Sequence, residues 1–400
     1  MKALKTLLKI PLYLILLAVI AININLYSTQ EYNTSAGYDE DVYAQLQHLK
    51  GEMHSNAAAY KMQRLFPEGF IFQNVLYGLT WCDLIQDETD ESIQQEALTE
   101  IDWAIEELLS ENGTEIFNEN LTPKYGIFYR GWTNYLIGKR LIIDDSPTKL
   151  KLLYAINSHE ISAAFDSSSN PYLESYSSAS WPADNMVAIA SLALKTKITK
   201  ESETTISAVD TWMSKVKSKL DKHGRIPHAV NWKTGNTVQE SRGNSMSLML
   251  CFLKDIDLDF AQEQFDSYKK DFVDSRLGLP GIREHQKGIT KGGDIDSGPV
   301  IWEIGGAASI VGQRTAALYG DWNTFQGLRN SIELFGAAYT WQGKKKYLFG
   351  QVPMADAFIA WSNVAASEAD IATTSNWRWR FQLGSLLIVF LCLFVIKKLK

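Results

Sequence analysis

The chain has 400 residues, of which 46% are hydrophobic and 21% are charged, so it can bury a large core in one large domain or two smaller ones. Its formal net charge of −7 repels phosphate backbones, and the compact basic run Lys344–Lys346 is typical of a solvated loop. Nucleic acid is therefore excluded as a partner. Cys82, Cys251 and Cys392 are far apart and lack metal-ligand spacing, which excludes a disulfide framework but leaves one Cys82–Cys251 bridge open.

Each end of the chain carries an apolar run flanked by lysines. Residues Ile10–Leu26 are apolar apart from two asparagines and follow Lys2, Lys5 and Lys9, a pattern typical of a signal anchor. The second run, Phe381–Ile396, is short for a hydrocarbon core of about 30 Å. Tryptophans that suit the membrane interface precede it, however, and lysines follow it. Both runs therefore predict membrane helices.

The lysines outside both runs predict the topology. We expect both termini to be cytoplasmic, the main domain to be extracytoplasmic, and the lipid bilayer to be a partner. The predicted domains are an anchor over residues 1–29, a toroid domain over 30–375, and a transmembrane helix with a basic tail over 376–400. Arg378 and Arg380 argue weakly against this orientation. The alternative is a cleaved signal peptide combined with a buried C-terminal helix.

Between the two ends, strand patterns are scarce and turn-rich stretches separate twelve predicted helical segments. These segments span residues 39–64, 70–86, 92–111, 127–141, 147–165, 185–196, 203–222, 244–254, 259–274, 300–318, 322–338 and 355–366. The odd-numbered segments are polar on one face, whereas the even-numbered ones, such as the segment from Met186, are apolar nearly all round. Six solvated helices alternating with six buried ones predict an all-α fold, an (α/α)6 toroid of six helical hairpins. A helical solenoid is the alternative. In a toroid the first and last helices are neighbours, so both anchors should leave the domain near each other.

The lengths of the connections support the toroid and indicate where a site would lie. Connections from even to odd segments are short, whereas those from odd to even segments start near Asn112, Asp166, His223, Ser275 and Trp341 and run for about a dozen residues or more. Long loops usually carry function. We therefore expect a site at the N-terminal ends of the inner helices, where helix dipoles favour negative charge.

Polar side chains are concentrated in these long connections. We predict Asp184, Glu284, Asp294 and Asp296 as catalytic, because acid and base catalysis needs a proton donor and an acceptor whose pKa values are pushed apart. Candidate substrate-binding residues in the same loops are Glu174, Trp181, His228 and Arg283. Aromatic and polar groups together suit a sugar or a terpenoid substrate.

Each of these assignments has a structural alternative. Asp184 and Asp296 stand where helix N-caps are expected, and a capping carboxylate stabilises its helix by about 1 kcal/mol without catalysing a reaction. Arg283 and Glu284 could form a salt bridge, and His228 could be a packed side chain.

No motif in the sequence predicts a metal or a cofactor. Asp294, Asp296 and Gly298 are spaced as in a calcium-binding loop, but Gly305 stands where that loop needs its glutamate. The nucleophile elbow, the phosphate-binding loop, the dinucleotide fingerprint and the zinc-protease motif are missing from the sequence. We therefore expect neither a metal nor a cofactor.

Several segments resemble the linalool dehydratase-isomerase family, whose (α/α)6 enzymes dehydrate and isomerise a monoterpene alcohol without a cofactor. The resemblance covers residues 60–365 and runs through the segments that start at Gly126, Asp184, Asn231, Ile282 and Asp294 and the segment near Met354.

The resemblance implies that Tyr129, Trp132, Ser175 and Asp184 line the active-site cavity. Family cysteines align with Ser175 and Asp184, and a family histidine aligns with Trp132, which argues against linalool itself as the substrate. We therefore expect a lyase or isomerase that acts on a small alcohol-like substrate. A glycan hydrolase or lyase of the six-hairpin type and a non-catalytic binding or scaffold protein are the alternatives.

Overall fold

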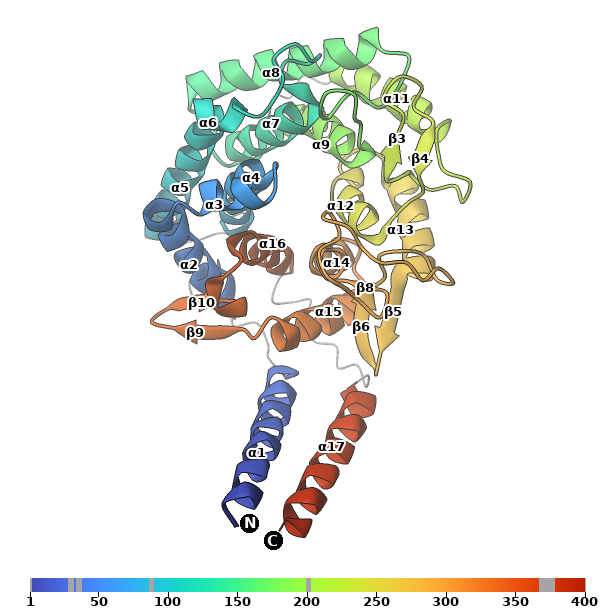
Figure 1. The fold of residues 1–400 in the computed structure, drawn as a ribbon. Helices are drawn as coiled ribbons and strands as arrows, with labels where there is room; N and C mark the ends of the chain where they lie inside the picture. The colour runs from blue at the N-terminus through green and yellow to red at the C-terminus, as the bar shows by residue number, and fades with distance from the viewer. Residues whose placement is uncertain are drawn as a thin grey trace.

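The computed structural model describes residues 2–27, 32–33, 38–85, 90–198, 203–366 and 378–399, and these are mostly helical, which confirms the predicted all-α class (Figure 1). The helices are α1 Lys2–Asn25, α2 Glu40–Asn56, α3 Ala58–Leu65, α4 Gly69–Leu84, α5 Glu91–Leu109, α6 Glu111–Thr114, α7 Gly126–Ile143, α8 Thr148–Ser167, α9 Pro182–Ala193, α10 Lys195–Ile198, α11 Glu203–Lys217, α12 Gly243–Leu253, α13 Leu258–Phe272, α14 Gly306–Leu318, α15 Trp322–Phe335, α16 Pro353–Asn363 and α17 Arg378–Lys398. The predicted domain limits at 29/30 and 375/376 lie outside the described residues.

Two of the predicted segments need correction. The first is two helices, because Ala57 adopts a left-handed conformation (φ 52°) and separates α2 from α3. The tenth begins at Gly306 rather than at residue 300. Residues 300–305 instead form a hairpin whose turn residues, Trp302 and Glu303, have φ angles of 48° and 66° that a right-handed helix cannot contain.

Six of the helices form a closed circuit of contacts, which we call the central ring. Helix α4 contacts α7, and the contacts continue through α9, α12, α14 and α16 back to α4. Outside them lie α2, α5, α8, α11, α13 and α15 (Figure 1). Aromatic side chains hold the ring together: Phe72 of α4 makes edge contacts with Trp132 of α7, whose ring meets Phe252 of α12. Cys82 and Cys251 are free thiols buried in this core, so no bridge joins them.

Strands occur in the described residues only as short antiparallel pairs. They are β1 Tyr32–Asn33 with β2 Tyr38–Asp39, β3 Ala229–Val230 with β4 Thr237–Gln239, β5 Val273–Arg276 with β6 Leu279–Ile282, β7 Val300–Ile301 with β8 Ile304–Gly305, and β9 Tyr339–Trp341 with β10 Lys344–Lys346. Four of the five pairs lie in the long connections that lead into central helices. These hairpins therefore give the predicted functional loops a fixed backbone.

The two terminal helices lie side by side, as expected, and leave the same edge of the domain (Figure 1). Both are long and apolar enough to cross a membrane. Asn23 of α1 donates a hydrogen bond to Ser385 Oγ of α17 at 2.9 Å. Arg378, at the start of α17, donates to the Leu26 carbonyl and to Asn330 of α15. The helix pair is therefore joined directly to the domain.

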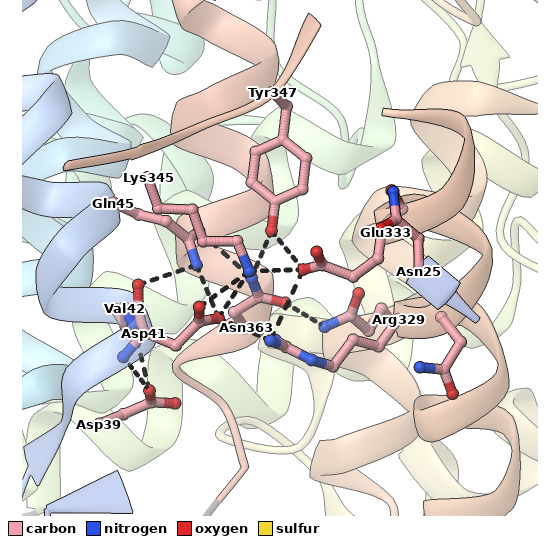
Figure 2. Close-up of polar contacts among 12 residues, drawn as sticks. Asn25, Asp39, Asp41, Val42, Gln45, Arg329, Glu333, Lys345, Tyr347 and Asn363 are labelled. Carbon is pink, nitrogen blue, oxygen red and sulfur yellow. Dashed lines mark hydrogen bonds and ion pairs between the residues drawn. The ribbon is translucent and has the colours of Figure 1, made fainter. Parts of the chain in front are cut away.

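A buried polar network joins the start of the domain to its end (Figure 2). Asp41 of α2 accepts hydrogen bonds from Arg329 of α15 at 2.6 Å and from Lys345 of β10 at 2.8 Å. Lys345 and the Tyr347 hydroxyl each donate to Glu333 at 2.7 Å. Two buried positive charges thus face two negative ones, which is how such charges are tolerated in a low-dielectric interior.

We predict that Asp41→Ala will strongly destabilise the fold. The substitution leaves the two buried cations, Arg329 and Lys345, with the single carboxylate of Glu333, and loss of one partner of a buried ion pair typically costs about 3–5 kcal/mol. Urea unfolding of the detergent-solubilised chain, followed by near-ultraviolet circular dichroism, measures the change. Glu119→Ala removes an exposed pair with Lys124 and should leave the unfolding midpoint unchanged. Equal unfolding midpoints for the two variants would show that Asp41 is not needed to join the start of the domain to its end.

Candidate functional site

Three carboxylates and a phenol lie within electrostatic range of one another at the N-terminal ends of the central helices. Glu68 is the N-cap residue of α4, Asp184 lies in the first turn of α9, and Asp296 lies in the loop before α14. Burial raises the pKa of the Tyr176 phenol well above 10, and the charges of Glu68, Asp184 and Asp296 raise it further. The phenol is therefore a neutral hydrogen-bond donor beside a group of acids, which we call the acidic cluster.

Asp184 is the most buried acid of this cluster. Burial raises its pKa to about 7, and the nearby charges of Glu68 and Asp296 raise it further, although a hydrogen bond with Ser175 opposes the shift. It is the third residue of α9, after Pro182, and no backbone hydrogen bond to its side chain is recorded. The alternative of an N-cap is therefore wrong for Asp184, because Trp181 holds that position. At neutral pH this carboxyl group can hold or release a proton.

The loop before α9 holds Ser175 against Asp184. The side chain of Asn185 accepts a hydrogen bond from the Leu173 amide at 2.7 Å and donates back to the Leu173 carbonyl. Ser175 is fully buried, and its Oγ accepts a hydrogen bond from the Trp181 amide at 3.2 Å. The serine hydroxyl is thus positioned to orient the carboxyl group of Asp184.

A second group is centred on Arg242, the N-cap residue of α12. Its guanidinium donates to Glu284 at 2.7 Å and to both oxygens of Asp294, and it lies 3.4 Å from His228 Nε2. A Cβ at Gly243 would lie 1.9 Å from the Arg283 carbonyl oxygen, so only glycine allows α12 to begin against the loop that carries Glu284.

Arg242 separates the pKa values of its neighbours. Its hydrogen bonds lower the pKa of Asp294 to about 2, whereas burial raises that of Glu284 to about 7 despite the same arginine. Burial, followed by the positive charge of Arg242, lowers the pKa of His228 to about 3. Asp294 is therefore a fixed carboxylate, Glu284 can exchange a proton near neutral pH, and His228 is neutral.

Asp296 connects the two groups. Its side chain is exposed, but desolvation by the surrounding residues raises its pKa, as do the negative charges of Asp294 and Glu68, while Arg242 opposes the shift. The alternative of an N-cap is wrong here too, because the β7–β8 hairpin separates Asp296 from α14, whose N-cap residue is Gly305. Asp294 instead accepts hydrogen bonds from the Asp296 and Ser297 amides, which is a local turn.

Two of the candidate binding residues organise their own loops. Arg283 pairs with Asp274 at 3.2 Å and with Glu303 at 3.7 Å, so the alternative of a salt bridge with Glu284 is wrong. It also donates to the Ile289 carbonyl. The Glu174 side chain accepts a hydrogen bond from the Ser178 amide at 2.6 Å.

Three aromatic candidates occupy different positions. Tyr129 donates its hydroxyl proton to the Leu108 carbonyl at 3.0 Å, which directs it toward α5 rather than toward the acidic cluster. Trp132 is fully buried in the central ring. Trp181 remains half-buried, with its ring edge-on to Tyr176 at a centroid distance of 5.7 Å. Trp181 is therefore the candidate aromatic residue that lies beside the acidic cluster.

Sequence reasoning missed Glu68 and Arg242, although a signal for both was present. Each immediately precedes a central helix, so the rule that places the long connections on one face also places these two residues there. Glu68 was overlooked because its connection is short. Arg242 lies 42 residues before Glu284, and its pairing with that carboxylate depends on the fold rather than on sequence spacing.

Comparison with known proteins adds no family assignment. The sequence matches no protein-family model and none of the curated proteins. Among the described residues, no three His, Cys, Asp or Glu side chains are arranged to hold a metal ion. The chemistry of the site therefore has to be argued from its own residues.

We predict that Asp184→Asn will flatten the dependence of stability on pH between pH 4 and 7. The carboxyl group ionises near pH 4 in the unfolded chain but near pH 7 in the folded one. The folded state thus binds more protons in this window, so this group makes folding less favourable as the pH rises, by at most about 1.4 kcal/mol per pH unit. Urea unfolding at a series of pH values measures the slope for the wild type and the variant.

Asp294→Asn provides a contrast of opposite sign. The pKa of Asp294 is lowered on folding, so its contribution is present above pH 4 and is lost as the pH falls toward 2. This variant should be less stable than the wild type at pH 7 and should approach it at low pH. If the free energies of unfolding of the wild type and of Asp184→Asn change in parallel with pH, the raised pKa of Asp184 is contradicted.

Proposed function

We propose that the domain is an (α/α)6 toroid tethered to a membrane by α1 and α17, with both termini cytoplasmic and the acidic cluster on the extracytoplasmic side. The closed circuit of central helices, each flanked by an outer helix, supports the toroid. The shared direction of the two terminal helices supports the orientation, because the lysine-rich ends of both lie together (Figure 1). Arg378 does not oppose it, since its guanidinium is bound by the domain.

We further propose that the chain is a cofactor-independent lyase or isomerase that acts by acid and base catalysis on a small, uncharged, alcohol-like substrate. The arrangement that carries this proposal is the buried carboxyl group of Asp184 beside Glu68 and Asp296. Among the described residues none of these three acids forms a salt bridge, and burial raises the pKa of Asp184 to about 7. A neutral carboxyl group next to a carboxylate supplies a donor and an acceptor at one place. The surplus of negative charge disfavours an anionic substrate.

The steps of such a dehydration can be assigned to these residues. Asp184 donates its proton to the substrate hydroxyl as the C–O bond breaks and water leaves. Asp296 accepts a proton from the adjacent carbon, and the electron pair of that C–H bond forms the C=C bond. Ser175 orients the donor, and Tyr176 and Trp181 flank the substrate. Glu284, with its pKa of about 7, is a second group of these loops that can hold a proton, and Arg242 holds Asp294 charged.

Glycan cleavage is a second candidate function, and one observation favours it. The half-buried ring of Trp181 lies beside Tyr176 and the acids, and aromatic rings with a few polar groups are what a sugar-binding site needs. Asp184 would then protonate the glycosidic oxygen, and Asp296 would act as base or nucleophile.

Asp184→Asn tests both reactions. We expect it to lower kcat by about 10²- to 10⁴-fold, because the amide cannot donate the proton that the leaving group needs. The detergent-solubilised full chain is incubated with a panel of small allylic and tertiary alcohols and with oligosaccharides, and products are measured by mass spectrometry. Turnover of the alcohols would support the lyase, and turnover of the glycans would support the hydrolase.

Asp356→Asn is the matched control. Burial also raises the pKa of Asp356 to about 7, but the charges that act on it come from Glu52 and Lys346 rather than from the acidic cluster. Its turnover should equal that of the wild type. Loss of turnover in both variants, or in neither, would remove Asp184 from the mechanism.

A further inference from the structure

The edge of the domain from which α1 and α17 leave exposes large apolar side chains. Leu277 is the turn residue between β5 and β6, and 63% of it is exposed; Phe335 ends α15, and 67% of it is exposed. Trp379 of α17 and Tyr27, which follows α1, are more than half exposed at the same edge. Such side chains are unfavourable in water when they are grouped on one surface.

Contacts place these side chains at the roots of the two terminal helices. One surface depression of about 560 Å³ is lined by Gly278 of the β5–β6 turn together with Trp379 and Arg380 of α17. Leu334, the neighbour of Phe335, packs with Leu26 and Leu279, and Phe381 of α17 packs against this group. The Leu277 turn and the end of α15 therefore sit directly beside the starts of the apolar helices.

The length of α17 determines the height of this edge above the bilayer. Its 21 residues span about 32 Å at 1.5 Å per residue, close to the ~30 Å thickness of the hydrocarbon core. The whole helix is therefore needed to cross, which puts Trp379 at the level of the lipid headgroups. Arg378 is hydrogen-bonded to Asn330 of α15, so no linker separates this level from the domain.

The terminal helices extend from the rim of the central ring rather than from either of its faces (Figure 1). The acidic cluster lies on one face, at the N-terminal ends of the ring helices. With the rim at headgroup level, the face that carries the acidic cluster is perpendicular to the membrane plane, and the cluster opens along the membrane surface.

We propose that the rim formed by Leu277, Phe335 and the roots of α1 and α17 lies in the headgroup region of the bilayer, so that the ring stands on its edge and the acidic cluster opens parallel to the membrane. Lipid is the occupant that fits, because the rim is continuous with two helices that need hydrocarbon around them. Arg380, which lines the same depression as Trp379, suits lipid phosphates. This inference rests on the proposed membrane tether.

Lipid contact can be measured residue by residue in the full chain. Cys392→Ala removes the membrane-helix thiol, and Cys82 and Cys251 are buried away from reagents. Single cysteines at Leu277 and Phe335 are labelled with a small fluorophore in nanodiscs of phosphatidylcholine and phosphatidylglycerol, and quenching by a shallow nitroxide lipid is recorded. Leu387→Cys, in the exposed middle of α17, reports whether this helix crosses the bilayer. Leu152→Cys, on α8 at the opposite edge of the domain, gives the background quenching (Figure 1).

We expect the labels at Leu277 and Phe335 to be quenched at least threefold more than the label at Leu152. If a deep nitroxide lipid quenches the label at Leu387, but the shallow one quenches the labels at Leu277 and Phe335 no more than the label at Leu152, the rim contact is overturned and the tether stands. If Leu387→Cys is not quenched by a deep nitroxide lipid, the tether itself fails. Energy transfer between labelled copies in vesicles, without lipid quenching, would assign the rim to a second copy and also overturn the proposal.

Discussion

The ring of helices depends on one buried carboxylate, that of Asp41. Its helix, α2, is at the start of the domain, whereas the cations that it binds, Arg329 of α15 and Lys345 of β10, come from near its end. Burial opposes ionisation of Asp41, but the charges of Arg329 and Lys345 outweigh it and lower the pKa of this carboxyl group. This neutralisation lets the first and last parts of the domain meet in a low-dielectric interior, beside the contact of α16 with α4.

The same balance of burial and pairing divides the acids of the candidate site into two classes. Asp184 and Glu284 are both buried, and burial dominates their pKa values even though Glu284 also has Arg242 as a partner. Asp294 is more exposed and receives two hydrogen bonds from that arginine, so it stays ionised. Carboxyl groups within one set of loops thereby differ in pKa by several units, which is the condition for acid and base chemistry at a single pH.

The long-range periodicity of apolar residues predicted most of the helices, whereas the hydrogen-bond and salt-bridge partners of individual side chains could not be predicted from the sequence. Alternating polar and apolar segments locate most of the long helices, because burial of one face imposes the pattern over many turns. The β7–β8 hairpin has only two residues per strand, too few for any alternation, so Asp296 was placed at a helix start. Glu284 pairs with Arg242 rather than with its sequence neighbour Arg283, since adjacent side chains of an extended segment point to opposite sides. Tyr129 was assigned to substrate binding by resemblance, but its position in the helix directs it toward α5.

Helix α15 connects the starts of the two terminal helices to the polar network around Asp41. Arg329 and Glu333, four residues apart, lie on one face and bind Asp41 and Lys345. Asn330 and Leu334, also four residues apart, lie on the adjacent face and contact Arg378 and Leu26. Because a helix is rigid over four residues, a displacement of the terminal helices moves the groups that close the ring. Contacts with the terminal helices and contacts with the Asp41 network are thus made by the same short segment, Arg329–Leu334.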